Sequence, residues 1–270
     1  ERAFSWCSGL TSIEIPSGVT IIRDRAFYNC TSLTSITIPK SVASVGDRAF
    51  SGCGNLTINL ENGSTLTSEN LGVNESQIRT YWNEGNLTWT LTADGTMTIS
   101  GTGAMTDYTK SGVAPWNKDY EEIRFVVIEN GVTTIGEYAF ENCTLLESVA
   151  ISDSVEKIGK YAFSGCSALK RISLPDSIAQ IGDHAFRASG LEAVKIPEGV
   201  TLLGEGMFAR CPNLQTVELP STLQTIRENA FIGSGLNKII LPENLKYIGY
   251  ECFYECTNLE EIKIPDSVTI

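Results

Sequence analysis

Residues 33–53, LTSITIPKSVASVGDRAFSGC, contain the pattern that decides the fold. The segment begins Leu-x-x-Ile-x-Ile-Pro, with β-branched residues at Ile36 and Ile38, and this spacing is typical of a short strand with one buried face. Pro39 supplies no amide donor, so we expect it to end the strand. Further apolar residues and Phe50 then return the chain to the interior.

The same pattern recurs with a period of 22 or 23 residues, apart from one long gap. Its clearest column is a phenylalanine, found at Phe4, Phe27, Phe50, Phe140, Phe163, Phe186, Phe208, Phe231 and Phe253. One such unit cannot bury its apolar face alone, so the repeat predicts a solenoid of stacked units with a common core. We expect parallel strands about 4.8 Å apart. A Gly-Asp or Gly-Glu pair should open a single helical turn in each unit, since a carboxylate favours a helix N-terminus.

Spacing also explains the cysteines, because all but one occupy a single column three residues after the phenylalanine. These are Cys7, Cys30, Cys53, Cys143, Cys166, Cys211 and Cys256, while Cys252 replaces the small residue before Phe253. Buried free thiols are therefore favoured, although neighbours in the column would be close enough to form disulfides. The chain has no C-x-x-C motif and a single histidine, His184, so a zinc site and other metal sites are not expected.

Residues 57–122 interrupt the repeat. We expect an end of a first array over 1–60, a linker or irregular segment over 61–86, a cap over 87–122 and a second array over 123–270. Two alternating runs around Asp94-Gly95 predict a β-hairpin, with Asp94 as a turn residue rather than a calcium ligand. Pro115 suits a first helical position, so 116–122 should form a short helix. The alternative is one solenoid with an insertion of about 60 residues.

Composition limits the classes of function. The formal net charge is −12, which argues against nucleic acid as a partner, since phosphate neutralisation needs clustered basic residues. No apolar run approaches the roughly 18 residues of a membrane span. A lone histidine at a variable position, core cysteines and no glycine-rich phosphate loop argue against an enzyme, and no cofactor is expected.

Both ends of the chain fall inside the repeating pattern, without an initiator methionine or a signal peptide. We expect a fragment of a longer protein, so the lack of targeting signals says nothing about location.

Over residues 1–56 and 123–270 the chain resembles the BspA-like, treponemal-type leucine-rich repeats, whose unit is Leu-x-x-Ile-x-Ile-Pro-x-x-Val-x-x-Ile-Gly-x-x-Ala-Phe-x-x-Cys. The resemblance implies a leucine-rich-repeat solenoid of α/β type, with a parallel sheet on its concave face and short helical turns and extended segments elsewhere. It also implies a secreted or surface-attached protein, and some members act as adhesins. Arg23 and Arg227 replace the glycine of the unit, while Asn130 and Ser152 lie where prolines are missing. The family offers no ligand motif to transfer.

Function should reside in the third and fifth positions of each strand, which point outward. Among them, Arg171, Lys195 and Lys238 could form a basic strip, and Arg171 is the best single candidate. The alternative is that these residues belong to a solvent-exposed face of mixed charge, with Glu218 and Glu261 interspersed. The candidate ligand-binding residues are Arg171, Lys195, Glu218, Lys238, Glu261 and Lys263. Phe125 and Val127 are apolar outward residues, and we expect the segment around Trp116 to cover them.

Three functions compete at this point. The first is an extracellular binding or adhesion module for a protein or glycan ligand on a host or neighbouring cell. The second is a passive stalk, favoured by small residues such as Ser148 and Ala150 on the outward strand positions. The third, an enzyme, lacks a recognisable nucleophile, base or metal site.

Overall fold

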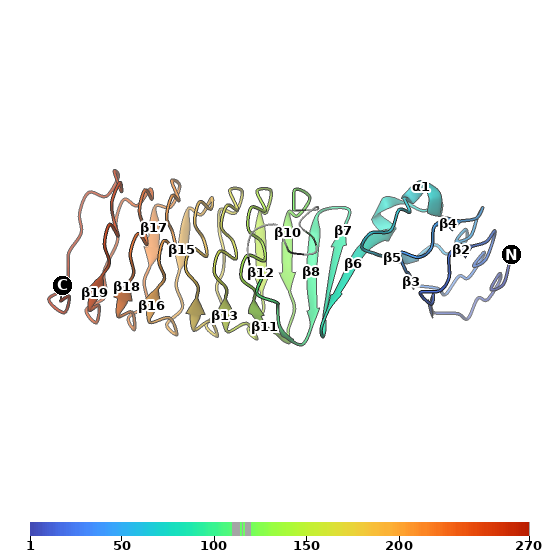
Figure 1. Cartoon of the computed structure of the whole chain (residues 1–270), viewed down its shortest axis with the longest axis horizontal. Coiled ribbons are helices and arrows are strands. Elements are labelled where there is room, and N and C mark those ends of the chain that lie inside the picture. Colours follow the sequence, from blue (N-terminus) through green and yellow to red (C-terminus); the bar gives the residue numbers. More distant parts are fainter. Residues whose placement is uncertain (110–113, 115, 117–119, 270) are drawn as a thin grey trace. The chain divides into compact units, whose positions relative to one another are not determined.

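The structure is a computed structural model that describes residues 1–109, 114, 116 and 120–269. The chain divides into two compact units, the first made of Glu1–Asn83 and Trp89–Thr96 and the second of Glu84–Thr88 and Met97–Ile270 (Figure 1). Each unit contains stacked repeats. The expected helix over 116–122 and its first position, Pro115, lie partly outside the described residues.

The first unit is built on parallel strands that repeat along the chain. Ser12 pairs with Ser35, and Ser35 pairs with Thr57, so the register advances by one repeat at each strand. A second, shorter ladder runs along another side of the same turns. The main ladder contains β1 (Ser12–Glu14), β3 (Ser35–Ile38), β5 (Thr57–Glu61) and β6 (Ile78–Glu84), and the shorter one contains β2 (Ile21–Ile22) and β4 (Ser44–Val45).

The segment expected to be an irregular linker is more ordered than its polar composition indicates. It contains α1 (Ser68–Leu71), the 3-10 helix Glu75–Gln77 and the strand β6. Thr67 caps α1 by accepting a hydrogen bond from the amide of Asn70, and Gly72 ends the helix in a left-handed conformation. β6 pairs in parallel with β5, so the segment supplies the backbone partner that the exposed edge of β5 requires.

The predicted hairpin is present, formed by β7 (Leu87–Thr92) and β8 (Thr96–Gly101). Asp94 accepts hydrogen bonds from the hydroxyl of Thr92 at 2.5 Å and the amide of Thr96 at 3.1 Å. These two bonds lower the pKa of Asp94. Gly95 takes the positive φ of 81° that the turn requires. Asp94 is thus engaged by the turn itself.

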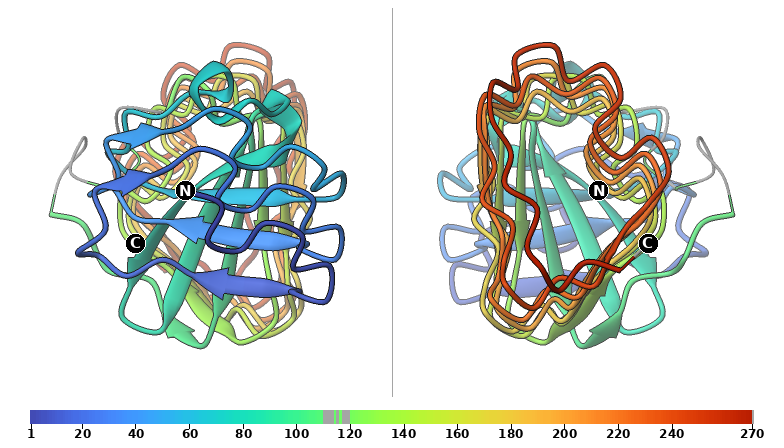
Figure 2. Two further views of the ribbon diagram at one scale, coloured as in Figure 1. Left: turned by 90° about the vertical axis from the view of Figure 1, so that its right-hand side faces the viewer. Right: turned by 90° about the vertical axis from the view of Figure 1, so that its left-hand side faces the viewer.

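The second unit has two sets of parallel strands on different sides of each turn. Viewed along the stack, its turns superpose closely (Figure 2). Equivalent positions of successive repeats therefore lie in rows along the unit. One set, here called the strand side, contains β10 (Phe125–Ile128), β12 (Ser148–Ile151), β15 (Ala193–Lys195) and β17 (Thr216–Glu218). The other contains β9 (Gly103–Ala104), β11 (Val132–Ile135), β13 (Lys157–Ile158), β14 (Gln180–Ile181), β16 (Leu202–Leu203), β18 (Thr225–Ile226) and β19 (Tyr247–Ile248).

The strand side is not the continuous ladder that the repeat predicts. β10 pairs with β12 and β15 with β17, each over three or four residues. The equivalent segments 171–174 and 238–241 form only single bridges, Arg171 with Ala193 and Lys238 with Glu261. The ladder is therefore interrupted after β12 and again after β17.

The turn around Ala-Phe also differs from the expected helical turn. Two of its residues adopt left-handed backbone conformations four positions apart, such as Arg25 at φ 53° and Asn29 at φ 56°. Alternate amides consequently point in different directions. Ala26 N–H donates within its own turn, to Arg23 O at 3.2 Å, whereas Phe27 N–H donates to Ala49 O of the next repeat at 2.9 Å. The turn therefore exchanges helical bonds for bonds between repeats.

The phenylalanines form a stacked column in the core of each unit, as predicted. Their ring centroids lie 5.3–5.7 Å apart, with nearly parallel planes. In the second unit Trp116 extends the column, with its ring 6.3 Å from that of Phe140 and its Nε1–H donating to Ala139 O at 3.0 Å. Trp116 thus packs on this column rather than on the strand side, where Phe125 and Val127 remain half-buried.

The cysteines are free thiols, and their column does more than fill space. In most repeats the Sγ donates a hydrogen bond to the carbonyl of the phenylalanine in the preceding repeat, at 3.0–3.2 Å. In the 22-residue units Ser189 and Ser234 take the same position, with their hydroxyls 3.4 and 3.3 Å from the sulfur of the next repeat. Burial raises the pKa of Cys143 and of Cys252 to about 12.

The stacked core predicts a large difference between two substitutions. Phe163 is fully buried and stacked on both faces, at 5.5 and 5.7 Å, so Phe163→Ala should lower the free energy of unfolding by about 3–5 kcal/mol. Lys195→Ala removes an exposed side chain and should change it by less than about 0.5 kcal/mol. Denaturant unfolding measures both values, and similar losses from the two variants would contradict the stacked core.

The thiol column predicts unequal reactivity among the eight cysteines. Only a thiolate reacts, and burial keeps most of these thiols protonated. At pH 7.5 the exposed Cys7 should react first with a chromogenic disulfide reagent, and Cys7→Ser should abolish this fast phase. The buried thiols should react only in denaturant. Rapid reaction of Cys166 in the folded protein, detected by mass spectrometry, would show that the column is open to solvent.

Candidate functional site

The sequence-predicted ligand-binding residues all lie exposed in the strand segments of the second unit. They are Arg171, Lys195, Glu218, Lys238, Glu261 and Lys263. The residues between them along the chain, such as Val194, Val217 and Ile239, are buried at 4–6% exposure. This alternation follows from strand geometry, in which successive side chains point to opposite faces.

The basic residues do not form a continuous strip. Lys195 lies opposite Glu218 in the β15–β17 ladder. Lys238 is bridged to Glu261, and Arg171 is bridged to Ala193. Acidic and basic groups therefore alternate across the strand side, which is the mixed-charge reading of the sequence. Within the described residues, the ion pairs of the chain involve none of these six side chains.

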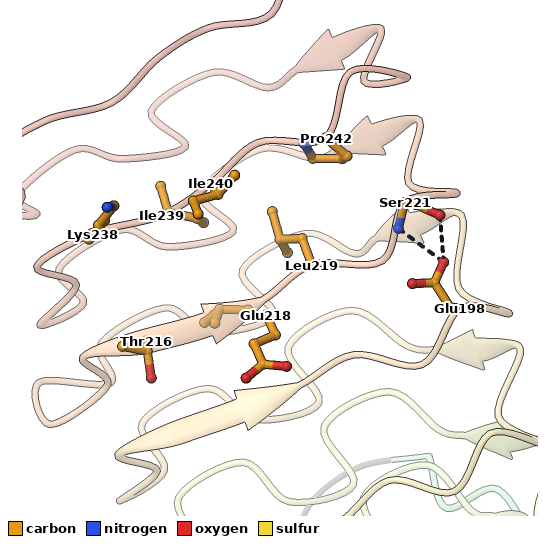
Figure 3. Close-up of a pocket in the computed structure, with 10 residues that line it drawn as sticks. Glu198, Thr216, Glu218, Leu219, Ser221, Lys238, Ile239, Ile240 and Pro242 are labelled. Atoms are coloured by element: carbon orange, nitrogen blue, oxygen red, sulfur yellow. Dashed lines mark hydrogen bonds between the residues drawn. The ribbon is translucent and has the colours of Figure 1, made fainter.

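A groove of about 640 Å³ opens where the ladder is interrupted after β17 (Figure 3). It brings together two of the six predicted residues, Glu218 and Lys238, from opposite walls. Asn237 N–H still donates to Gln215 O at 3.3 Å, but among the described residues the segment 238–241 forms no bridge with β17. The two segments separate beyond this point, and the space between them is the groove.

The groove has an apolar interior and a charged rim. Val217 and Ile239 are 6% and 4% exposed, and Leu219 and Pro242 are half-buried. Ile240 is 73% exposed, although it is a large apolar residue. Apolar walls with a few polar groups at the edge, in a volume of several hundred Å³, are typical of ligand-binding clefts.

One end of the groove is held by a side-chain clamp between repeats. The carboxylate of Glu198 accepts hydrogen bonds from Ser221 N at 3.0 Å and Ser221 Oγ at 2.8 Å (Figure 3). Glu198, Ile240 and Pro242 are not among the site residues predicted from the sequence. An available signal was Ile240 itself, a large apolar residue at an outward strand position next to the predicted Lys238.

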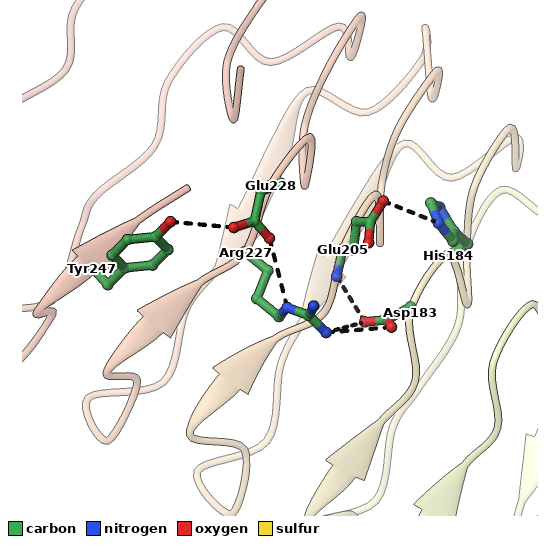
Figure 4. Close-up of polar contacts among 6 residues, drawn as sticks. All are labelled: Asp183, His184, Glu205, Arg227, Glu228 and Tyr247. Carbon is green, nitrogen blue, oxygen red and sulfur yellow. Dashed lines mark hydrogen bonds and ion pairs between the residues drawn. The ribbon is translucent and has the colours of Figure 1, made fainter. Parts of the chain in front are cut away.

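A second polar cluster lies at the turns of the same unit, outside the groove. Arg227, which replaces the glycine of its repeat, reaches across two repeats and donates to both oxygens of Asp183, at 3.1 and 3.3 Å (Figure 4). Its Nε lies 3.7 Å from Glu228, which accepts a hydrogen bond from Tyr247 at 3.2 Å. Asp183 also accepts from Glu205 N at 2.8 Å. The substitution of glycine by Arg227 therefore adds a bond between repeats.

His184 stands beside this cluster and is part of an aromatic stack. Its ring lies 4.6 Å from that of Tyr161, which stacks on Tyr138 at 4.9 Å. His184 Nδ1 is buried without a hydrogen bond, while Nε2 lies 3.8 Å from Glu205 (Figure 4). Burial lowers the pKa of His184, and the neighbouring Glu205 partly opposes this change. These features indicate a structural role in the turn.

The lowered pKa of His184 predicts a pH dependence of stability. The unfolded chain, with a histidine pKa near 6.5, binds this proton more readily than the folded chain. The contribution of the neutral His184 ring to the free energy of unfolding is therefore fully present above about pH 6.5. It is lost as the pH falls through the pKa of His184 in the folded protein. His184→Asn retains a residue suited to the left-handed backbone, as Asn229 shows in the same column. Urea unfolding from pH 8 to 5 should show a shallower loss in this variant, and parallel curves would contradict this role.

Neither a membrane-crossing helix nor a metal-binding group is found in the part of the chain that the structure describes. No helix there is long and apolar enough to cross a membrane. No group of three or more histidine, cysteine, aspartate or glutamate residues is placed to hold a metal ion.

Comparison with known proteins identifies the family. The model of the BspA type leucine-rich repeat region matches residues 1–88, 118–234 and 180–270, in six copies. A leucine rich cell surface protein from Faecalibacterium prausnitzii A2-165 is 35% identical over 67% of this chain and 53% of its own, with a TM-score of 0.52.

A leucine-rich repeat protein from Bacteroides ovatus ATCC 8483 is 32% identical over 69% of this chain and 54% of its own, with a TM-score of 0.53. The chain thus spans about half the length of these two structures. No curated protein matches it. The predicted leucine-rich-repeat solenoid is confirmed, and the chain belongs to the family of BspA-type leucine-rich repeat proteins.

Proposed function

We propose that this chain is a non-catalytic binding module of a cell-surface or secreted protein, and that it holds a protein ligand in the groove between β17 and residues 238–241. The observation that carries the proposal is the groove itself, an apolar cleft with a charged rim on the strand side of a repeat protein. The name of the Faecalibacterium relative, a cell surface protein, supports the location.

The open ladder favours an extended polypeptide as the ligand. Where two parallel strands separate, their facing backbone groups no longer pair with one another, and a ligand backbone can provide hydrogen-bond partners. Val217 and Ile239 offer an apolar floor for one ligand side chain. Glu218 and Lys238, on opposite walls, would attract ligand groups of opposite charge and so fix its direction.

The side chains with catalytic potential are occupied elsewhere, which supports a binding role over an enzymatic one. Burial raises the pKa of the core thiols, as in Cys166, so they stay protonated at neutral pH. The lone histidine stacks on Tyr161 and does not line the groove. Among the lining residues of the groove, the hydroxyl of Ser221 already donates to the Glu198 carboxylate, and no imidazole or thiol accompanies this pair.

The second candidate is a passive stalk. The outward residues of β12, Ser148 and Ala150, are small and neutral, and such a surface offers little to recognise. A solenoid tied by backbone bonds between repeats also makes a suitable spacer. If the chain is a stalk, the groove is a local irregularity of the stack that binds no ligand.

A binding array of purified extracellular matrix proteins and glycans distinguishes the two functions. Lys238→Glu and Ile240→Ser alter the groove at exposed positions, so folding should be preserved. Lys246→Glu is the matched control, since Lys246 is exposed in the same repeat next to β19 and does not line the groove. We expect a protein ligand whose affinity falls at least about tenfold in both groove variants, equal to about 1.4 kcal/mol, and is unchanged in the control.

Other outcomes contradict the proposal in different ways. Binding that survives both groove substitutions would place the interface elsewhere on the chain. A glycan bound at the groove in place of a protein would overturn the ligand class. The stalk would be favoured if neither the wild type nor the variants bound any member of the array.

A further inference from the structure

The first unit contains three arginines in one repeat column, here called the arginine row: Arg2, Arg25 and Arg48. All three adopt left-handed conformations, with φ of 55°, 53° and 52°. Arg2 N–H donates to Asp24 O at 3.1 Å and Arg25 N–H to Asp47 O at 2.9 Å, so the backbone holds the row in register. The same column in the second unit contains Tyr138, Tyr161, His184, Gly206, Asn229 and Glu251.

The arginine row lines a pocket of about 410 Å³ together with Ser5, Trp6 and Tyr28. No carboxylate contributes to its lining, although the whole chain has a net charge of −12. The ring of Trp6 packs edge-on against that of Tyr28, with the centroids 6.0 Å apart. The pocket therefore combines a planar aromatic surface with three guanidinium groups.

The guanidinium groups of the row make no ion pair among the described residues. Asp24, the nearest acid in sequence to Arg25, directs its carboxylate to the amide of Asp47 at 3.1 Å. Like charges stacked one repeat apart repel one another, so a bound anion would stabilise this arrangement.

The chemistry of the pocket selects a particular kind of anion. A guanidinium group binds a planar carboxylate through two parallel hydrogen bonds. The rings of Trp6 and Tyr28 in the pocket lining provide flat apolar faces with polar edges, on which a sugar ring can stack. Nucleic acid is disfavoured, because its affinity depends on neutralising many phosphates and this acidic chain has only three arginines here.

We propose that the arginine row, with Trp6 and Tyr28, is a binding site for an acidic oligosaccharide that carries uronic-acid carboxylates. The carboxylates would bind to Arg25 and its neighbours in the row, and one sugar ring would lie on Trp6. This site belongs to the first unit and is independent of the groove proposed to bind a protein ligand.

Isothermal titration calorimetry with tetragalacturonate tests the proposal, with a neutral galactose tetramer as the control ligand. Arg25→Asn and Arg48→Asn remove the charge and keep a residue that accepts the left-handed backbone, as Asn229 does in this column. Arg210→Asn is the matched control, because Arg210 is exposed, has φ of 56° and lies outside the pocket. Lys238→Glu, which alters the groove, separates failure of one site from failure of the other.

We expect tetragalacturonate to bind and the neutral tetramer not to bind. Each row variant should weaken binding at least tenfold, Trp6→Ala should weaken it as well, and Arg210→Asn and Lys238→Glu should leave it unchanged. Thermal melts confirm that the variants are folded. The proposal is overturned if tetragalacturonate does not bind, if both tetramers bind equally, if the row variants bind as the wild type does, or if a thymidine oligonucleotide binds more tightly than the sugar.

Discussion

Everything in this structure depends on the left-handed residues of the Ala-Phe turn. A residue such as Arg25 or Tyr161 in that conformation directs the neighbouring amides alternately into its own turn and toward the next repeat. Helical bonds would close each turn on itself, and a turn so short has no stability alone. The bonds between repeats fix the spacing at which the phenylalanine rings stack and the cysteine thiols reach the preceding carbonyl. The backbone bonds between repeats thus determine both the stacked core and the thiol hydrogen bonds of each unit.

Because of this register, the side chains at one surface position of the repeat form a line along each unit. The column of the left-handed turn residue contains arginines in the first unit and stacked rings, including Tyr161 and His184, in the second. The same backbone therefore presents a row of guanidinium groups in one unit and an aromatic stack in the other. A surface side chain can also contact a more distant repeat, since the guanidinium of Arg227 donates a hydrogen bond to Asp183 two repeats away. Variation in such columns changes the surface without altering the core.

At the groove, by contrast, some of the backbone bonds that join neighbouring repeats are missing. The backbone ladder of the strand side is interrupted after β17, while the Ala-Phe turns of the same repeats remain bonded and the rings of Phe208 and Phe231 remain stacked. The stability of the stack does not rest on the strand side alone, so this side can open without loss of the fold. Binding surfaces on a rigid scaffold commonly arise in this way, from the part that the core does not constrain.

The sequence by itself determined the solenoid, the Phe163 column, the cysteine column and the hairpin at Asp94-Gly95, because each depends on spacing along the chain. It also placed Glu218 and Lys238 on the outward positions, since strand alternation is a local rule. Only the tertiary structure decided that the turns are not helical, because the bonds that oppose the helix come from the next repeat. The groove beside Ile240 likewise depends on which backbone bonds fail to form between repeats. The arginine row becomes a pocket only because Ser5, Trp6 and Tyr28 lie beside it, and the repeat period alone does not show which side chains of different columns come together.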